Sequence, residues 1–253
     1  MRECDLGMLK YYLFLILLAI VSCGPIEKEN YSKYQSYPCK IRSLPGLVNS
    51  TRTDKFPAVV PVETEKGFCT GTIIGKCTVL TAAHCFSNKE HIVRIHVGDS
   101  IYDETQWVKV HPQYKNPGIN DLTIIRFEYQ IVETDPIAIS LVEPKEKEEI
   151  ILVGYGTTET SGAGLTNKTY GYNNINRLSQ TEMEFVSPGA TVLPGDSGGP
   201  VLRKEDNSYS QIGINVTYVD MGSFDNRISY ALRLDYYYMF IIEDSLNDIL
   251  FRR

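Results

Sequence analysis

One stretch of the sequence has the composition expected around a reactive serine. Residues 193–200 place Ser197 between glycines. Gly195 and Gly198 permit backbone angles that other residues resist, so main-chain N–H groups beside Ser197 can point into a small concavity. Such groups stabilise the negative charge that develops on a carbonyl oxygen under attack. Ser197 is therefore the candidate nucleophile.

Two upstream residues could activate this serine. A serine hydroxyl is a poor nucleophile at neutral pH, so it needs a base that accepts its proton. His84 is the candidate base, and Asp121, which opens an apolar run, is a candidate carboxylate to orient the imidazole and stabilise its cation. The other histidines, His91, His96 and His111, have no comparable surroundings.

The three local contexts resemble those of a known family. They read Thr-Ala-Ala-His-Cys, Asp-Leu-Thr-Ile-Ile and Gly-Asp-Ser-Gly-Gly-Pro in chain order. This order and these motifs resemble the trypsin/chymotrypsin-like serine endopeptidases. The similarity continues with Cys69 before Cys85 and with Gly-Tyr-Gly at 154–156, and it covers roughly residues 47 to 250.

The resemblance implies a role for each of these residues. His84, Asp121 and Ser197 would form the catalytic triad, and the backbone N–H groups of Gly195 and Ser197 would be the oxyanion donors. Asp196 would be buried and would pair with the amine released by zymogen cleavage. The implied fold is all-β, with two six-stranded antiparallel barrels and a C-terminal helix.

Hydrophobic periodicity agrees with an all-β reading. Val93, Ile95 and Val97 alternate with polar residues, as in a half-buried strand. A helix is expected after Asp235, with Met239, Ile242, Leu246 and Ile249 on one face. Strands are expected at 56–62, 67–74, 78–81, 92–97, 106–111, 122–127, 149–153, 179–185, 200–203, 210–217 and 227–234.

Composition narrows the class of partner. The chain has 253 residues, 43% of them hydrophobic, which is enough for one catalytic unit with a proper core. A formal net charge of −6 argues against nucleic acid as the main partner, because phosphate binding requires clustered Lys and Arg. The family resemblance implies protein or peptide substrates, and we expect no cofactor and a monomer.

The N-terminus has the features of an export signal. Residues 11–22 are apolar but too short to span a membrane comfortably, so 1–22 is interpreted as a signal peptide. The run ends at Cys23 and resembles a bacterial lipobox, which would lipidate Cys23 and hold the protein at the cell envelope. An ordinary signal peptide with a chance cysteine, leading to secretion, is the alternative. Residues 23–46 are polar and read as a tether or propeptide ahead of a protease domain at 47–253.

Four further cysteines suggest disulfides in an exported chain. The resemblance implies a Cys69–Cys85 bridge that ties the histidine loop to the strand before it, which leaves Cys39 and Cys77 as the remaining pair. The family's bridge beside the nucleophile is missing, because Leu193 occupies the position of its first cysteine. A Cys/His metal site is the competing interpretation, but no CxxC pair exists.

The substrate pocket departs from that of trypsins. Thr191 lies six residues before Ser197, where trypsins carry an aspartate, so weak cleavage after Lys or Arg is expected. Small, apolar or uncharged polar side chains are preferred instead. The opposite wall of the pocket is expected near Asn215, Val216 and Thr217.

The activation site has two candidates. Leu47, in Leu-Val-Asn-Ser, resembles the family's mature start, so its amine would be the partner of Asp196. A trypsin-like activator would instead cut after Lys40 and expose Ile41. The function expected overall is a serine endopeptidase that works through an acyl-enzyme. The alternative is a protease-like binding or scaffolding lipoprotein with little or no activity.

Overall fold

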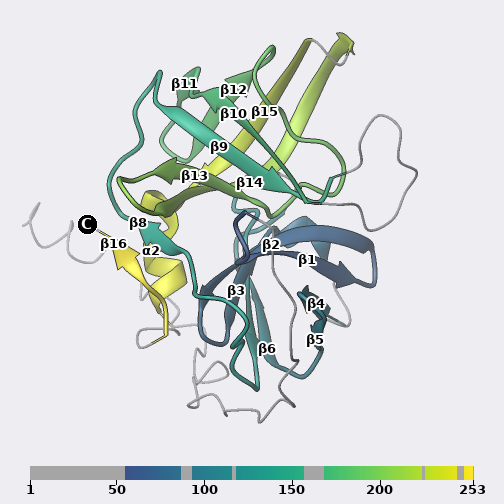
Figure 1. The fold of residues 1–253 in the computed structure, drawn as a ribbon. Coiled ribbons are helices and arrows are strands. Elements are labelled where there is room, and N and C mark those ends of the chain that lie inside the picture. Colours follow the sequence, from purple (N-terminus) through teal and green to yellow (C-terminus); the bar gives the residue numbers. More distant parts are fainter. Residues whose placement is uncertain are drawn as a thin grey trace, which may run out of the picture. The chain divides into compact units, whose positions relative to one another are not determined.

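The computed structural model describes residues 55–86, 93–115, 118–156, 168–223, 226–243 and 248–252. All of them fall within one compact unit. In this part of the chain, strands form two hydrogen-bonded sheets, one from the N-terminal half and one from the C-terminal half (Figure 1). None of the helices described here combines the length and apolar character needed to cross a bilayer.

The first sheet contains seven strands of the described chain, in the spatial order β5-β4-β1-β2-β3-β7-β6. Its core follows from strand alternation: Val93, Ile95 and Val97 are buried, whereas Arg94 between them is exposed. The bounds are β1 Val59–Thr64, β2 Gly67–Gly75, β3 Thr78–Thr81, β4 Val93–Val97, β5 Ser100–Tyr102, β6 Thr105–Val110 and β7 Thr123–Phe127.

The second sheet follows the order β10-β9-β13-β14-β15-β12-β11, with β8 and β16 attached beside β14. Strand β14 is its longest and pairs with both β13 and β15. The bounds are β8 Ala138–Ser140, β9 Glu149–Gly154, β10 Thr169–Asn174, β11 Arg177–Leu178, β12 Glu182–Val186, β13 Pro200–Lys204, β14 Tyr209–Ser223, β15 Asn226–Arg233 and β16 Phe251–Arg252.

A shared apolar cluster packs the two sheets against each other. Leu80 and Ile124 of the first sheet meet Ile214 and Leu232 of the second. The helix α2, Leu234–Ile242, contributes to the same cluster. Burial of these side chains fixes the two sheets relative to each other, and with them the loops that each sheet carries.

The helix forms where it was expected but buries a different face. Its buried residues are Leu234, Tyr237 and Ile241, whereas Met239 is 61% exposed. The helix begins one residue before Asp235, which pairs with Arg233 and makes no cap. Ile249 is buried beyond the helix, in a bridge to Gly75, and Leu246 lies outside the described residues.

His111 packs between this helix and β6. Its ring lies 5.7 Å from the Tyr237 ring and 4.6 Å from the Phe240 ring, between centroids. Burial, with a smaller contribution from the charge of Lys109, lowers the pKa of His111 from 6.5 to about 4. The folded protein therefore keeps this imidazole neutral where the unfolded chain protonates it.

We expect the free energy of unfolding to fall as the pH drops from about 6.5 to about 4, because the unfolded chain then binds a proton that the folded chain does not. Urea denaturation at several pH values measures this effect. His111→Phe should remove the His111 contribution, so the difference between wild type and variant should vary with pH in this window. A difference that is constant from pH 4 to 7 would contradict the prediction.

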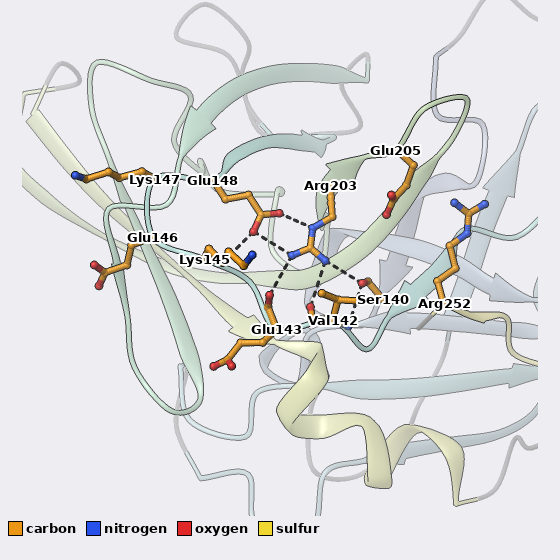
Figure 2. A pocket seen from close by; sticks show the side chains of 10 residues that line it. All are labelled: Ser140, Val142, Glu143, Lys145, Glu146, Lys147, Glu148, Arg203, Glu205 and Arg252. Atoms are coloured by element: carbon orange, nitrogen blue, oxygen red, sulfur yellow. Dashed lines mark hydrogen bonds and ion pairs between the residues drawn. The ribbon is translucent and has the colours of Figure 1, made fainter.

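Arg203 in β13 ties the strand that follows the nucleophile stretch to the connection between β8 and β9. Figure 2 shows its guanidinium surrounded by acceptors from that connection. It donates to Ser140 Oγ at 3.0 Å, to the Val142 and Glu143 carbonyls, and to both carboxylate oxygens of Glu148. Burial raises the pKa of Glu148, but hydrogen bonds from Arg203 and the Lys145 amide outweigh it and leave the pKa below its usual value.

Arg203→Met is expected to lower the free energy of unfolding by about 2 kcal/mol, because it leaves the half-buried Glu148 carboxylate without its cation. The loss is smaller than for a fully buried pair, since both side chains keep some contact with water. Urea denaturation measures it. Lys147→Asn removes an exposed cation from the same pocket and should have almost no effect. Equal losses in the two variants would contradict the prediction.

The predicted fold class is confirmed: the chain is mostly β, with two barrel-like halves and a short C-terminal helix. The predicted strands lie close to observed ones, but β14 extends to Ser223, beyond the predicted end at 217, and β10 was not predicted. The described sheets hold seven strands in the first half and nine in the second, not six in each. Four of the additional strands, β5, β8, β11 and β16, have two or three residues each and are too short to show a periodic pattern, whereas the six residues of β10 are all exposed or partly exposed and carry no apolar alternation.

Candidate active site

His84 and Asp121 are in direct contact. His84 lies in a short 3₁₀ turn, Ala83–Cys85, after β3, and Asp121 lies just before β7. The His84 Nδ1 atom is 2.7 Å from Asp121 Oδ2, and the His84 main-chain N–H donates to Asp121 Oδ1 at 2.8 Å. Asp121 is fully buried, whereas the imidazole is 22% exposed. The carboxylate therefore fixes the ring while one edge of the ring remains accessible.

The loop that carries Asp121 is fixed by the C-terminal helix. Tyr237 Oη donates to Asn120 Oδ1 at 3.0 Å, and Asn120 adopts a left-handed backbone with φ of 54°, which asparagine tolerates better than most residues. The Gly118 N–H also donates to Asp121 Oδ2, at 3.2 Å. These contacts hold the carboxylate in place from its own loop and from the distant helix.

The nucleophile stretch, between β12 and β13, lies against the segment that leads to His84. Gly198 has φ of 83°, and a Cβ atom there would lie 2.1 Å from Thr81 Oγ1 and 2.8 Å from the Ala82 nitrogen. Only glycine allows this close approach. The residue after Ser197 therefore touches the two residues before the turn that carries His84.

Thr70 in β2 connects this stretch to the first sheet. Its N–H donates to the Ser197 carbonyl at 2.8 Å, and its hydroxyl donates to the Gly195 carbonyl at 2.7 Å. The same hydroxyl accepts a hydrogen bond from the Tyr155 N–H at 2.9 Å. The sequence analysis missed this residue, because a threonine inside a strand carries no local signal of such contacts.

Two main-chain donors beside the nucleophile have no acceptor among the described residues. In the described part of the chain, neither the Gly195 nor the Ser197 N–H donates to a protein group. Ser197 Oγ makes no hydrogen bond to His84 among the described residues. Such contacts are often long in unliganded enzymes and tighten when substrate binds.

The Asp196 carboxylate lies against two glycines, Gly154 and Gly156. Its Oδ1 accepts from the Gly156 N–H at 2.7 Å and its Oδ2 from the Leu193 N–H at 2.9 Å. A Cβ atom on Gly154 or Gly156 would collide with this carboxylate. Burial raises the pKa of Asp196, and the two main-chain hydrogen bonds oppose that rise.

The expected substrate-pocket residues do not all line one cavity. Thr191 and Asn215 both line a cavity beside Asp196. Val216 is buried in the cluster between the two sheets, and Thr217 pairs with Tyr230 of β15. The structure therefore brings two of these four residues together.

The three cysteines among the described residues are all disulfide-bonded. Cys69 and Cys85 form a disulfide, as the resemblance implies. Their sulfurs and the His84 ring lie close enough to suggest a metal site, but the disulfide removes the thiolates that a metal would need. Cys77 is also disulfide-bonded, while the expected partner Cys39 lies outside the described residues, as do Cys23 and Leu47.

Comparisons with known proteins agree with this geometry. The CLIP domain-containing serine protease B4 of Anopheles gambiae is 26% identical over 249 residues, which cover 77% of this chain and 69% of the relative. Serine protease 1 of Homo sapiens is 25% identical over 215 residues, which cover 75% of this chain and 81% of the relative.

A solved structure of neuropsin, described as a serine protease expressed in the limbic system of mouse brain, matches with a TM-score of 0.62 at 21% identity. The match covers 74% of this chain and 94% of the neuropsin chain, and at this identity it shows the fold alone. The sequence profile of the trypsin family matches residues 47–241, most of the chain. The chain therefore belongs to the trypsin family.

Proposed function

We propose that the protein is a serine endopeptidase that hydrolyses peptide bonds through an acyl-enzyme. The observation that carries the proposal is the short contact between the buried Asp121 carboxylate and His84 Nδ1, next to the docked nucleophile stretch. A carboxylate at Nδ1 keeps the proton on that nitrogen and leaves Nε2 free to act as a base. His84 thus has the tautomer that can deprotonate Ser197.

The reaction proceeds in two halves. Ser197 Oγ attacks the scissile carbonyl while His84 Nε2 takes the hydroxyl proton, and the imidazolium then gives that proton to the leaving amine. Water then gives a proton to the same imidazole and attacks the resulting ester, the bond between the acyl carbon and Ser197 Oγ breaks, and the imidazolium returns the proton to Oγ as the acid product leaves. Asp121 stays ionised and stabilises the imidazolium in both halves.

The oxyanion of each tetrahedral intermediate would bind the Gly195 and Ser197 N–H groups. These donors have no protein acceptor in the described chain, so a substrate oxygen displaces no internal hydrogen bond. One such donor contributes about 3 kcal/mol to transition-state stabilisation.

An organophosphonate serine-hydrolase probe tests this function. We expect the probe to label the wild-type protein covalently and to fail with Ser197→Ala. A binding or scaffolding protein with an unreactive site would not label at all, although it would be folded. Absence of labelling in a folded wild-type protein, with its processed N-terminus, would overturn the proposal.

We also propose that the chain is exported and anchored at a bacterial cell envelope through a lipid on Cys23. The apolar run before Cys23 and the small residue preceding it support this proposal. Metabolic labelling with a radioactive fatty acid tests it. Label in the wild type that is lost in Cys23→Ser is the expected result, whereas an unlabelled protein in the medium would indicate an ordinary signal peptide and secretion.

We propose further that the protein is made as a zymogen and that cleavage before Leu47 completes activation. Asp196 is partly buried next to the nucleophile, and an amine there would pair with a carboxylate that now has only main-chain partners among the described residues. N-terminal sequencing of the active form identifies the cleavage site. A start at Ile41 would favour cleavage after Lys40, and an active form that starts at Cys23 would show that the Gly156 and Leu193 amides satisfy Asp196 by themselves.

A further inference from the structure

A cavity of about 130 Å³ lies beside the nucleophile stretch. Its lining includes Thr191, Val192, Asp196 and Asn215, together with residues of β9 and β10. Within the described residues that line it, Asp196 is the charged one, and both of its oxygens already accept a main-chain hydrogen bond. The remaining lining is apolar or uncharged.

Asn215 is held next to Ser197 by its main chain. Its carbonyl accepts from the Gly198 N–H at 2.8 Å, and its N–H donates to the Gly199 carbonyl at 2.8 Å. The residue is 1% exposed, yet neither Oδ1 nor Nδ2 has a hydrogen-bond partner among the residues that the structure describes. A buried amide without partners is unfavourable, so this residue is expected to have a ligand in the working protein.

The wall opposite Asn215 is fixed before any ligand arrives. Asn173 Nδ2 donates to the Ala190 carbonyl at 2.7 Å, and the Ala190 N–H donates to the Tyr172 carbonyl at 2.9 Å. The Val192 N–H donates to Ser229 Oγ at 3.0 Å. The segment that contains Thr191 is therefore attached on both sides, so the cavity keeps its shape.

We propose that Asn215 selects a carboxamide side chain, glutamine first and asparagine second, at the substrate residue whose carbonyl Ser197 attacks. This inference depends on the proposed endopeptidase function. A carboxamide offers one donor and one acceptor side by side, and these match Oδ1 and Nδ2 of Asn215 once the Asn215 amide, which is closed to solvent in the structure, turns toward the cavity. A cavity of about 150 Å³ holds benzene, so 130 Å³ suits a glutamine side chain, which is slightly smaller.

Other side chains leave polar groups unpaired. Leucine would fill the cavity but would leave the Asn215 amide without partners. Glutamate would bring a carboxylate next to Asp196 without a lining cation, and arginine would have to compete with the main-chain donors that hold Asp196. A site built for hydrogen bonding discriminates against such substrates more strongly than an apolar site does.

The experiment uses peptides that differ only in this residue, Gln, Asn, Leu or Arg, and measures kcat/KM for the processed protein. We expect the Gln peptide to exceed the Leu and Arg peptides at least about tenfold. Asn215→Leu should lower the Gln-to-Leu ratio by about tenfold to a hundredfold. Asn215→Thr, which is smaller, serves the same purpose if the leucine variant does not fold.

Gln211→Met is the matched control. Gln211 is a fully buried amide in the same strand, with an Oε1 atom that also lacks a partner, but it does not line the cavity. Its replacement should leave the order of the four peptides unchanged. A preference for Arg or Leu in the wild type, or an Asn215→Leu variant that loses activity equally on all four peptides, would overturn the inference.

Labelling of wild-type Ser197 by the organophosphonate probe distinguishes failure of the carboxamide inference from failure of the proposed endopeptidase function. A protein that labels but shows no Gln preference contradicts the carboxamide inference alone. A protein that does not label contradicts the endopeptidase function itself.

Discussion

Ser197→Ala is expected to lower kcat for peptide hydrolysis by roughly 10⁶-fold, and His84→Ala by a similar factor. The serine oxygen forms the bond to the substrate, and no described side chain offers a second nucleophile at this position. The imidazole supplies the only base placed against the Asp121 carboxylate in the described structure. Each removal therefore abolishes the acyl-enzyme route, leaving the slower catalysis that substrate binding and oxyanion donors provide.

The double variant makes this expectation sharper. Because the two residues act as a unit, Ser197→Ala combined with His84→Ala should lose little more activity than either change alone. Initial rates on a fluorogenic peptide measure all three variants, and Ser100→Ala, a serine in β5, is the matched control. The thermal midpoint of Ser197→Ala should stay close to that of wild type. Near wild-type turnover in a folded single variant would remove that residue from the proposed triad.

The residues of the candidate site could be selected from the sequence because they stand in short local contexts. Motifs around His84, Asp121 and Ser197 each span a few residues, and chain order does not require knowledge of the packing. The Cys69–Cys85 disulfide followed in the same way from the resemblance. Fold class was predictable too, because alternation in strands such as 93–97 reports burial directly.

Contacts between distant segments were not predictable in this way. Thr70 reaches Gly195 across 125 residues, and Asp196 finds its donors at Gly156, 40 residues away. Such contacts depend on how β2 and β9 lie against the nucleophile stretch, which a single sequence does not show. The prediction of the buried helix face was wrong for a related reason. The spacing of apolar residues places Met239 on one possible apolar face, but contacts with the neighbouring core determine which face is buried. In the structure that face contains Tyr237 and Ile241.

The hydrogen bonding of the Asn215 side chain could not be predicted from the sequence either. Its place near the substrate pocket was expected from its position in the chain, but its unpaired amide was not. Whether a buried asparagine finds partners depends on every element packed around it. The sequence therefore indicated that Asn215 lines a pocket, and the structure added the unpaired amide from which we propose carboxamide recognition.

Asp121→Asn is expected to lower kcat by roughly 10⁴-fold while the protein stays folded. Asp121 accepts three hydrogen bonds: Oδ1 from the His84 N–H at 2.8 Å, and Oδ2 from His84 Nδ1 at 2.7 Å and the Gly118 N–H at 3.2 Å. An asparagine side chain has only one oxygen, so an NH₂ group must take the place of the other carboxylate oxygen. A main-chain N–H can only donate a hydrogen bond, whereas an imidazole nitrogen can donate or accept one, depending on the tautomer of the ring.

We expect the asparagine oxygen to keep the shorter main-chain bond, from the His84 N–H, and its NH₂ group to face Nδ1. An NH₂ group there donates a proton, so the ring must accept it and carry its own proton on Nε2 instead. A ring protonated at Nε2 cannot take the proton from Ser197. The geometry of the site would therefore survive, with the base in the wrong tautomer.

Two measurements check this mechanism together. Steady-state kinetics should show the loss in kcat, and proton NMR should show that the downfield Nδ1–H signal of His84 in the wild type disappears in Asp121→Asn. Asp103→Asn, at an exposed carboxylate after β5, is the matched control and should change neither. A variant that keeps the Nδ1–H signal and near wild-type kcat would show that the carboxylate does not set the tautomer of His84, and Asp121 would then be a structural residue of its loop.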